Sequence, residues 1–325
     1  MRKPSLPHLA TPRGDACNAA SAPIAVRRTT SAAVRLLALE AALVVTWSSG
    51  FVGTRFSIDH GSAFLVVFWR CVLVALALLP WVAGPLRRTP AALLLRHAGI
   101  GLLAMAGYLA GVAKGIEYGV PAGVAALIAD LLPIGTALLG AGLLGQRLNR
   151  RAWLGLLLGL LGVILVTRDA LAWGGTPPWT YGLPLLGMLS LALATLWQKQ
   201  ADSPASMGLL SNLWVQCAIS AVAFAALAGR EGSLLPVASA GFALSVLWTA
   251  ALSTLGGYGL YWICLRRSSP TRVASVLYLS PAVTLVWAWA MFGEPLSWLM
   301  LVGTAVSACG IWMVVRNEPR FSGSG

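Results

Sequence analysis

From Leu36 onward, apolar runs of about 16–25 residues follow one another along the chain, separated by short segments that hold most of the charge. A bilayer core about 30 Å thick needs about 20 helical residues, so each run has the length of a membrane-spanning helix. The runs do not alternate apolar and polar residues, as the strands of a membrane barrel do. With 58% hydrophobic and only 10% charged residues, the chain could not cover its surface with polar groups in water.

These runs predict an all-α polytopic membrane protein with ten transmembrane helices. Helices are expected because they satisfy their own backbone hydrogen bonds within the hydrocarbon layer. The predicted helices cover approximately residues 36–56, 62–84, 97–117, 121–144, 152–167, 181–199, 206–228, 239–264, 273–292 and 296–315.

The positions of the 23 Lys and Arg residues predict the orientation. With the amino terminus inside, most cations fall in cytoplasmic segments, as the positive-inside rule requires. Both termini are then cytoplasmic. The exceptions are Arg55, Lys114, Arg168 and Arg230, which fall outside, and Arg70, which falls within the second helix.

An internal repeat links the two halves of the chain at a constant offset of 148 residues. It pairs helices four and five with helices nine and ten without a gap. The matched residues include Ala126 and Ala274, Pro133 and Pro281, Thr136 and Thr284, Gly145 and Gly293, Leu148 and Leu296, Gly155 and Gly303, Gly162 and Gly310, and Arg168 and Arg316.

The repeat predicts two five-helix units of opposite orientation, because an odd number of crossings reverses the second copy. The loop after the fourth helix reads GQRLNRR and suits an inside position, whereas its counterpart GEPLSWL has no Lys or Arg and suits an outside position. Inverted repeats of this kind occur in many transporters, with the substrate near the midplane.

The predicted organisation is a disordered basic tail at 1–33, a first five-helix repeat at 34–168, a second at 169–316, and a short tail at 317–325. The amino-terminal segment is rich in Pro, Ala, Ser and Arg and has no apolar core suited to a signal peptide.

Three segments resemble the drug/metabolite transporter superfamily, specifically EamA-type exporters. Residues 47–70 match the opening pattern of the family: Trp47, then a small polar pair, an aromatic residue followed by Val, and Arg70 at the end. Residues 122–166 and 273–315 are similar to the two hallmark repeats of the family. The resemblance covers about residues 36–316. It departs at Gln146, where the family commonly has Glu; only the second copy keeps the acid, as Glu294.

The resemblance implies a gradient-driven exporter of the inner membrane that works by alternating access. The residues suit amino acids, small metabolites or drugs alike. A membrane sensor or partner-binding protein without transport activity stays open as an alternative. A membrane-embedded enzyme fits less well, because intramembrane catalysis needs paired Asp residues, Ser with His, or a His-rich metal site. The three histidines lie in tails or at helix ends, and only one Asp is predicted to lie deep in the membrane.

Arg70 and Asp130 are the main candidates for a substrate or proton site, because ionisable groups are costly in the bilayer core. Their predicted depths match, so an ion pair between them is expected, either structural or functional. Tyr278 occupies the position of Asp130 in the second copy. Trp47, Tyr108, Tyr258 and Tyr261 are further candidates for the lining of a central cavity, with plain helix packing as the alternative for each.

Glycines at four-residue spacing predict close helix contacts. Gly107, Gly111 and Gly115 form one such face, and Gly155 with Gly159 form another, mirrored by Gly303 and Ser307. These faces serve contacts within the subunit or in a homodimer, and the sequence leaves both open.

The expected partners are therefore a small-molecule substrate and the lipid bilayer, with no nucleic acid, because the cations sit between apolar runs. No cofactor or metal is expected, since the five cysteines form no CxxC pair. The sequence contains no GxxxxGK[ST] phosphate loop, so ATP hydrolysis by the chain is not expected.

Overall fold

The computed structural model describes residues 23–145, 148–172, 176–201, 207–267, 273 and 276–316, and no strand occurs within these ranges. The chain divides into two compact units, Met1–Ala38 and Leu39–Gly325. In the first, residues 23–38 belong to a helix that begins at Pro23, earlier than the expected start near 36. The remainder of the predicted tail, 1–22, and residues 317–325 lie outside the described residues.

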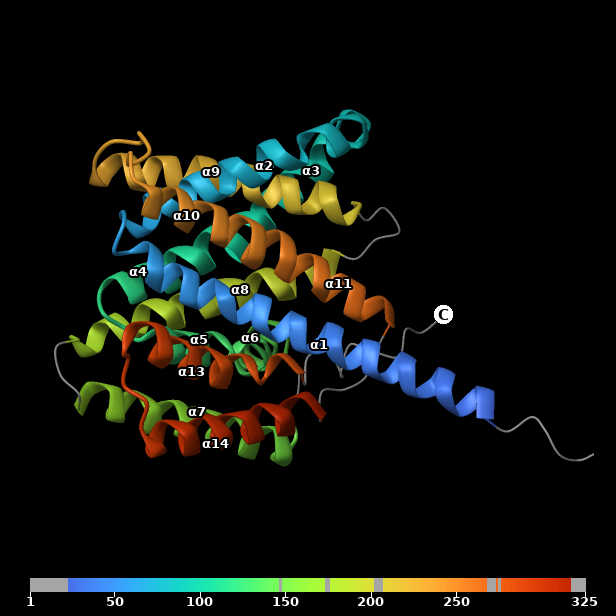
Figure 1. The fold of residues 1–325 in the computed structure, drawn as a ribbon, viewed down its shortest axis with the longest axis vertical. Helices are drawn as coiled ribbons and strands as arrows, with labels where there is room; N and C mark the ends of the chain where they lie inside the picture. Colours follow the sequence, from blue (N-terminus) through green and yellow to red (C-terminus); the bar gives the residue numbers. More distant parts are fainter. Residues whose placement is uncertain are drawn as a thin grey trace, which may run out of the picture. The chain divides into compact units, whose positions relative to one another are not determined.

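The helices follow the apolar runs closely (Figure 1). They are α1 (Pro23–Ser57), α2 (Ala63–Arg87), α3 (Ala91–Gly101), α4 (Tyr108–Glu117), α5 (Ala122–Ala129), α6 (Leu132–Leu144), α7 (Arg150–Ala172), α8 (Gly182–Ala201), α9 (Leu209–Glu231), α10 (Ala240–Trp248), α11 (Tyr258–Arg267), α13 (Ser280–Phe292) and α14 (Trp298–Arg316). Two π-helical segments, η1 (Leu102–Gly107) and η3 (Thr249–Gly257), and one 3-10 turn, η2 (Pro178–Tyr181), complete the described elements.

Within the described residues, eight helical segments are long and apolar enough to cross a membrane, and Ser280–Phe292 and Trp298–Met313 are shorter apolar helices. The expectation of an all-helical polytopic membrane protein is thus confirmed, while the count of ten spans stays a prediction. The eight segments are Val34–Ser57, Ala63–Arg87, Ala91–Glu117, Ala122–Leu143, Arg150–Ala172, Pro178–Gln198, Leu209–Glu231 and Ala240–Tyr261.

Helices distant in sequence pack side by side in the second unit. α2 lies against α9, α4 against α8, α5 against α13, and α7 against α14, as Figure 1 shows for α2 with α9 and for α7 with α14. Every residue of α5 is buried, as expected of a helix that is apolar on all sides and enclosed by others.

The apolar run that was expected to form a single helix at 121–144 is interrupted. α5 ends at Ala129 and α6 begins at Leu132, with Asp130 and Leu131 between them. Pro133 explains the break, because a proline has no N–H to donate to the carbonyl of Ala129 and its ring crowds that carbonyl. Proline within an apolar run was the sequence signal for this break.

The second copy repeats this geometry. α6 and α13 are both 13 residues long, and their bounds differ by the same offset as the sequence repeat. Each ends in a left-handed glycine, Gly145 at φ 64° and Gly293 at φ 68°. These helices therefore end alike, because only glycine enters the left-handed region without steric cost.

The start of the next helix is also alike in the two copies. Asn149 Oδ1 accepts a hydrogen bond from the Ala152 N–H at 2.8 Å at the start of α7. Ser297 Oγ accepts one from the Met300 N–H at 3.1 Å at the start of α14. Both side chains cap the first turn of their helix.

The glycine faces predicted from the sequence lie within the subunit. A Cβ on Gly310 would collide with the backbone of Gly155 and Gly159, so α7 and α14 approach each other closely there. A Cβ on Gly111 would collide with the backbone of Gly187 on α8. These contacts use the faces inside one chain and give no indication of a homodimer.

Candidate functional site

A cavity of about 400 Å³ lies within the second unit. Its volume falls in the range of small-molecule sites. Most of its lining is aromatic, apolar or uncharged polar. The lining residues are Trp47, Gly50, Phe51, Thr54, Arg70, Ala104, Met105, Tyr108, Leu109, Val112, Leu132, Leu191, Gln198, Leu209, Asn212, Leu213, Gln216, Ser253, Tyr258 and Tyr261.

The cavity brings together most of the side chains predicted for the site. Trp47, Arg70, Tyr108, Tyr258 and Tyr261 line it, whereas Asp130 and Tyr278 are not among its lining residues. Tyr278 packs instead against the buried cluster around α5, as do Trp47 and Tyr108.

Arg70 lies on α2 with 6% of its surface exposed. Its Nε donates a hydrogen bond to Thr254 Oγ1 at 2.7 Å, and its Nη2 donates to Ser253 Oγ at 3.4 Å. Among the described residues, the ion pairs do not include one between Arg70 and Asp130. The predicted ion pair is therefore wrong. Equal depth is insufficient for contact, because the rotation of each helix about its axis also decides which side chains meet.

Asp130 lies at the break between α5 and α6. Its backbone N–H donates to the Ala126 carbonyl at 2.9 Å. Its Oδ2 is buried and has no hydrogen-bond partner among the described residues. Tyr108 lies within electrostatic range of both Asp130 and Arg70. A buried carboxyl oxygen without a partner is costly, which makes Asp130 a functional candidate independently of Arg70.

Three aromatic side chains gather at one side of the cavity. The Trp47 ring centroid lies 6.1 Å from that of Tyr258 and 6.2 Å from that of Tyr261. We call these three residues the aromatic wall. Aromatic rings at this spacing offer a broad apolar surface that still carries polar groups at its edges.

Both π-helical segments contribute to the cavity. η1 ends directly before Tyr108, and η3 ends directly before Tyr258. Within η3, the Thr254 hydroxyl donates to the Thr249 carbonyl at 3.0 Å. π-helical turns inside α-helices are frequent at functional sites. These segments were not predicted from the sequence, because a π-helical register has no simple residue pattern.

Several uncharged polar lining residues were also missed: Thr54, Asn212, Gln216 and Ser253. Asn212 Oδ1 lies 3.0 Å from Nδ1 of His97, and Gln216 is buried. The amides of Asn212 and Gln216 within an apolar run were a sequence signal for a cavity lining, because polar groups are costly in lipid and therefore face the protein interior.

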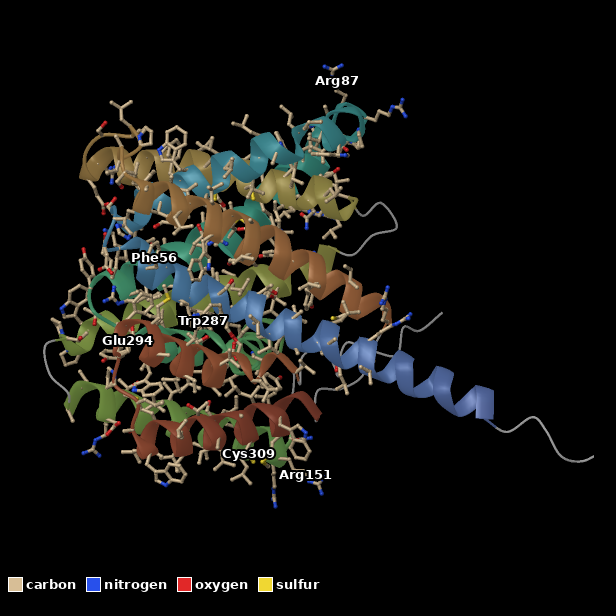
Figure 2. All side chains as sticks on the ribbon, in the orientation of Figure 1. Phe56, Arg87, Arg151, Trp287, Glu294 and Cys309 are labelled. Carbon is tan, nitrogen blue, oxygen red and sulfur yellow. The ribbon has the colours of Figure 1, made fainter. Side chains whose placement is uncertain are left out.

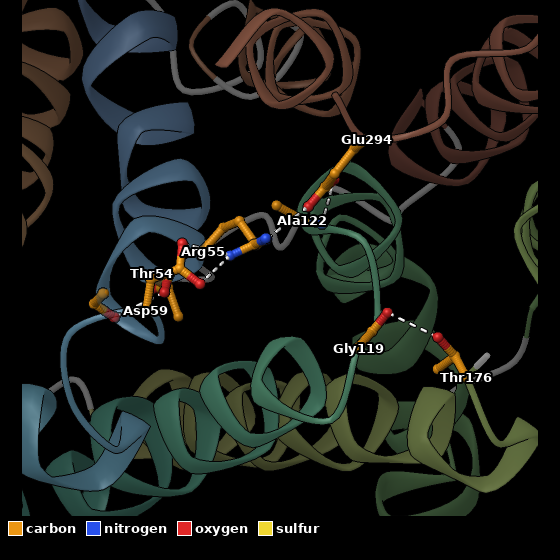
Figure 3. Close-up of polar contacts among 8 residues, drawn as sticks. Thr54, Arg55, Asp59, Gly119, Ala122, Thr176 and Glu294 are labelled. Atoms are coloured by element: carbon orange, nitrogen blue, oxygen red, sulfur yellow. Dashed lines mark hydrogen bonds and ion pairs between the residues drawn. The ribbon is translucent and has the colours of Figure 1, made fainter. Parts of the chain in front are cut away.

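A polar network joins α1, α5 and the α13–α14 connection at one end of the helices (Figure 3). Arg55 Nη1 donates to Asp59 at 3.1 Å, and Arg55 Nε lies 3.5 Å from Glu294 Oε1. Glu294 Oε2 accepts a hydrogen bond from the Ala122 N–H at 2.9 Å. Burial raises the pKa of Glu294, while the Ala122 N–H and Arg55 act in the opposite direction.

A second network lies at the same end and uses Lys114. Its ammonium pairs with Glu117 and with Glu231, and lies 4.5 Å from the centroid of the Phe64 ring. Glu117 Oε1 accepts from the Ala63 N–H, the first residue of α2, at 2.9 Å. In each network, one glutamate therefore caps a helix start and pairs with a cation. We call this end of the second unit the Glu294 end.

In the part of the chain that the structure describes, no group of three or more His, Cys, Asp or Glu is placed to hold a metal ion. Beside apolar groups, the described residues of the cavity lining supply one guanidinium, aromatic rings, hydroxyls and amides. Such groups bind and orient a solute.

The EamA-like transporter family model matches residues 35–168 and again residues 178–316. The "Probable amino-acid metabolite efflux pump" of Salmonella typhimurium is 28% identical over 296 residues, covering 86% of this chain and 96% of that protein. The protein of the same name from Escherichia coli (strain K12) is 27% identical, covering 84% and 92%.

The "Uncharacterized inner membrane transporter YedA" of Escherichia coli (strain K12) is 26% identical over 271 residues, covering 80% of this chain and 85% of that protein. A solved structure described as "Crystal structure of protein" has a TM-score of 0.59 at 16% identity, covering 90% of this chain and 99% of that one. At this identity the likeness concerns the fold alone. Because the family model covers nearly all of the helical part, the chain belongs to the EamA-like transporter family and is a multi-pass membrane transporter.

Proposed function

We propose that the protein exports amino acids, other small metabolites or drugs across the inner membrane by alternating access, driven by an ion gradient. The observation that carries this proposal is the cavity of about 400 Å³ between helices of the membrane-spanning part. The names of the relatives, efflux pumps and an inner membrane transporter, support the direction and the location.

The proposed architecture is two inverted five-helix repeats, residues 34–168 and 169–316. The equal lengths of α6 and α13 and the left-handed glycines that end them support it. Substrate sites between such repeats are typically formed at discontinuous helices. The break at Asp130 and Leu131 has this character.

Alternating access requires one end to be closed while the cavity is open to the other. Contacts at the Glu294 end support closure there: Arg55 joins α1 to Glu294, and Phe56 stacks on Trp248 with ring centroids 5.9 Å apart. Trp248 in turn lies 5.9 Å from Trp287 of α13. The cavity lining also includes Gln198, near the last residue of α8, and Leu209, the first residue of α9. These two helix ends lie away from the Glu294 end.

Both termini are proposed to be cytoplasmic. Figure 2 shows Arg87 and Arg151 at the end of the helices opposite to Glu294. Exposed cations at that end fit the cytoplasmic side under the positive-inside rule. The Glu294 end then faces outward, and the cavity opens toward the cytoplasm, as loading of an exporter requires.

Gradient coupling is assigned to Asp130. Its Oδ2 is buried and has no hydrogen-bond partner in the described part of the chain. Such a carboxyl is suited to exchange a proton as the helices rearrange, because either protonation state leaves part of it unsatisfied. Tyr278, its counterpart in the repeat, packs against the same buried cluster and is proposed to respond to the same movement.

The test compares the metabolites released by cells that express the protein with those released by cells carrying an empty vector. The compounds enriched in the medium are then assayed singly in proteoliposomes with and without an imposed pH gradient. We expect accumulation driven by the gradient. Proteoliposomes that move none of these compounds faster than protein-free vesicles contradict the proposal.

A further inference from the structure

We propose that the cavity selects solutes that carry a carboxylate, and that Arg70 binds this carboxylate. The inference rests on the proposed transport function and specifies its substrate class. It separates two classes that the sequence left equivalent, because amino acids and organic acids have a carboxylate, whereas cationic drugs do not.

No carboxylate of the described residues forms an ion pair with the buried charge of Arg70. Arg70 lines the cavity with 6% of its surface exposed. Its guanidinium donates hydrogen bonds to the neutral hydroxyls of Thr254 and Ser253, and none of the ion pairs among the described residues includes it. A charged group in this position is costly and is retained where it has a partner or a function.

Among the described residues that line the cavity, Arg70 alone carries a formal charge at neutral pH. Apart from Arg70, the lining consists of apolar residues, aromatic residues, hydroxyls and amides. Arg70 thus places a guanidinium directly in the wall of the cavity, where it attracts an anion and repels a cation. Asp130 is not part of this lining.

The guanidinium is held in place by the π-helical segment η3. The Thr254 hydroxyl donates to the Thr249 carbonyl at 3.0 Å, so its oxygen is oriented to accept the 2.7 Å bond from Arg70 Nε. A guanidinium has five N–H donors in a planar fork, and these two contacts leave donors for a ligand. A carboxylate matches such a fork with two parallel hydrogen bonds.

The remainder of the solute would meet the aromatic wall of Trp47, Tyr258 and Tyr261. Tyr258 is close to both features, since it lines the cavity with Arg70 and directly follows η3. A solute with a carboxylate at one end and a compact apolar body at the other therefore fits both.

Binding to the purified full-length protein tests the inference with three probes of similar shape. 3-Phenylpropionate has a carboxylate only, L-phenylalanine has a carboxylate and an ammonium, and phenethylamine has an ammonium only. We expect the first two to raise the melting temperature of the protein in detergent and phenethylamine to have no effect, because a ligand that binds the folded state stabilises it. This comparison needs no variant and is independent of folding defects.

Arg70→Gln should weaken binding of both carboxylate probes by about tenfold or more, and Arg70→Lys should weaken it less. Arg87→Gln is the matched control, because Arg87 is an exposed arginine near the end of the same helix. Binding of phenethylamine as strong as that of 3-phenylpropionate overturns the inference, as does a lack of carboxylate binding or an Arg70→Gln variant that binds like the unaltered chain. Transport of amines alone would overturn it while leaving the transporter function intact.

Discussion

Glu294 Oε2 accepts a hydrogen bond from the Ala122 backbone N–H at 2.9 Å, so the connection between α13 and α14 caps the first turn of α5. The same carboxylate lies 3.5 Å from Arg55 Nε. One side chain thus links three segments that are far apart in sequence. The corresponding position in the first copy is Gln146, which lies outside the described residues.

Glu294→Ala should lower the thermal stability of the protein, because it removes the acceptor for a helix-start N–H. The expected loss is about 1 kcal/mol, typical of a removed cap. Thermal unfolding in detergent measures it, with Asp59→Ala as the control, since Asp59 also contacts Arg55 but is exposed. Equal stability of the two variants would show that the cap contributes nothing.

Glu294→Gln should have a pH-dependent effect on stability. Burial raises the pKa of Glu294 above its usual range, so the folded state favours the protonated form. Protonated Glu294 therefore contributes to the stability of the folded state at acidic pH, and this contribution is lost as pH rises through the raised pKa. The unaltered protein should therefore lose stability relative to Glu294→Gln between acidic and neutral pH. A difference in melting temperature that stays constant across this range would contradict the prediction.

Gly310→Ala should destabilise the contact between α7 and α14. The added Cβ would meet the backbone of Gly155 and Gly159, which cannot move aside as a side chain can. A loss of about 1–3 kcal/mol is expected from overpacking. Gly142→Ala on α6 is the control, because a Cβ there has nothing within 4 Å. If both variants unfold at the same temperature, the close approach is unimportant for stability.

Asp130→Asn should yield folded protein whose transport no longer responds to a pH gradient. The substitution keeps the size of the side chain but removes its ability to lose a proton. It breaks no hydrogen bond of Oδ2 to any described residue. Flux in proteoliposomes with and without an imposed gradient measures the effect. A variant that keeps the full gradient dependence would place the coupling elsewhere.

Asn149→Cys and Ser297→Cys should react with a membrane-impermeant maleimide from opposite sides, in a background without other cysteines. The two residues cap corresponding helix starts in the two copies, and the proposed inverted repeats place those starts on opposite faces. Intact cells and inside-out vesicles provide the two exposures. Labelling of both positions from one side would exclude inversion.

Local properties of the sequence determined much of the fold. The length and apolarity of each run decide that it forms a helix in lipid, because the backbone has no other way to satisfy its hydrogen bonds there. The glycines at 145 and 293 set the ends of α6 and α13 for the same local reason. For Trp47, Tyr108, Tyr258 and Tyr261 the sequence offered a cavity lining and plain helix packing as alternatives; all four line the cavity, and their part in substrate binding stays a prediction.

Tertiary structure alone decided which side chains meet. Sequence gives the depth of Arg70 and Asp130 along their helices, but the neighbours of each helix and its rotation about its axis depend on packing throughout the bundle. Packing brings Arg70 to Thr254 and Ser253 instead. It also places the glycine faces of α7 and α14 against each other. The π-helical register of η3 positions the Thr254 hydroxyl that accepts from Arg70. This register depends on how η3 packs against distant helices, which residue patterns do not encode.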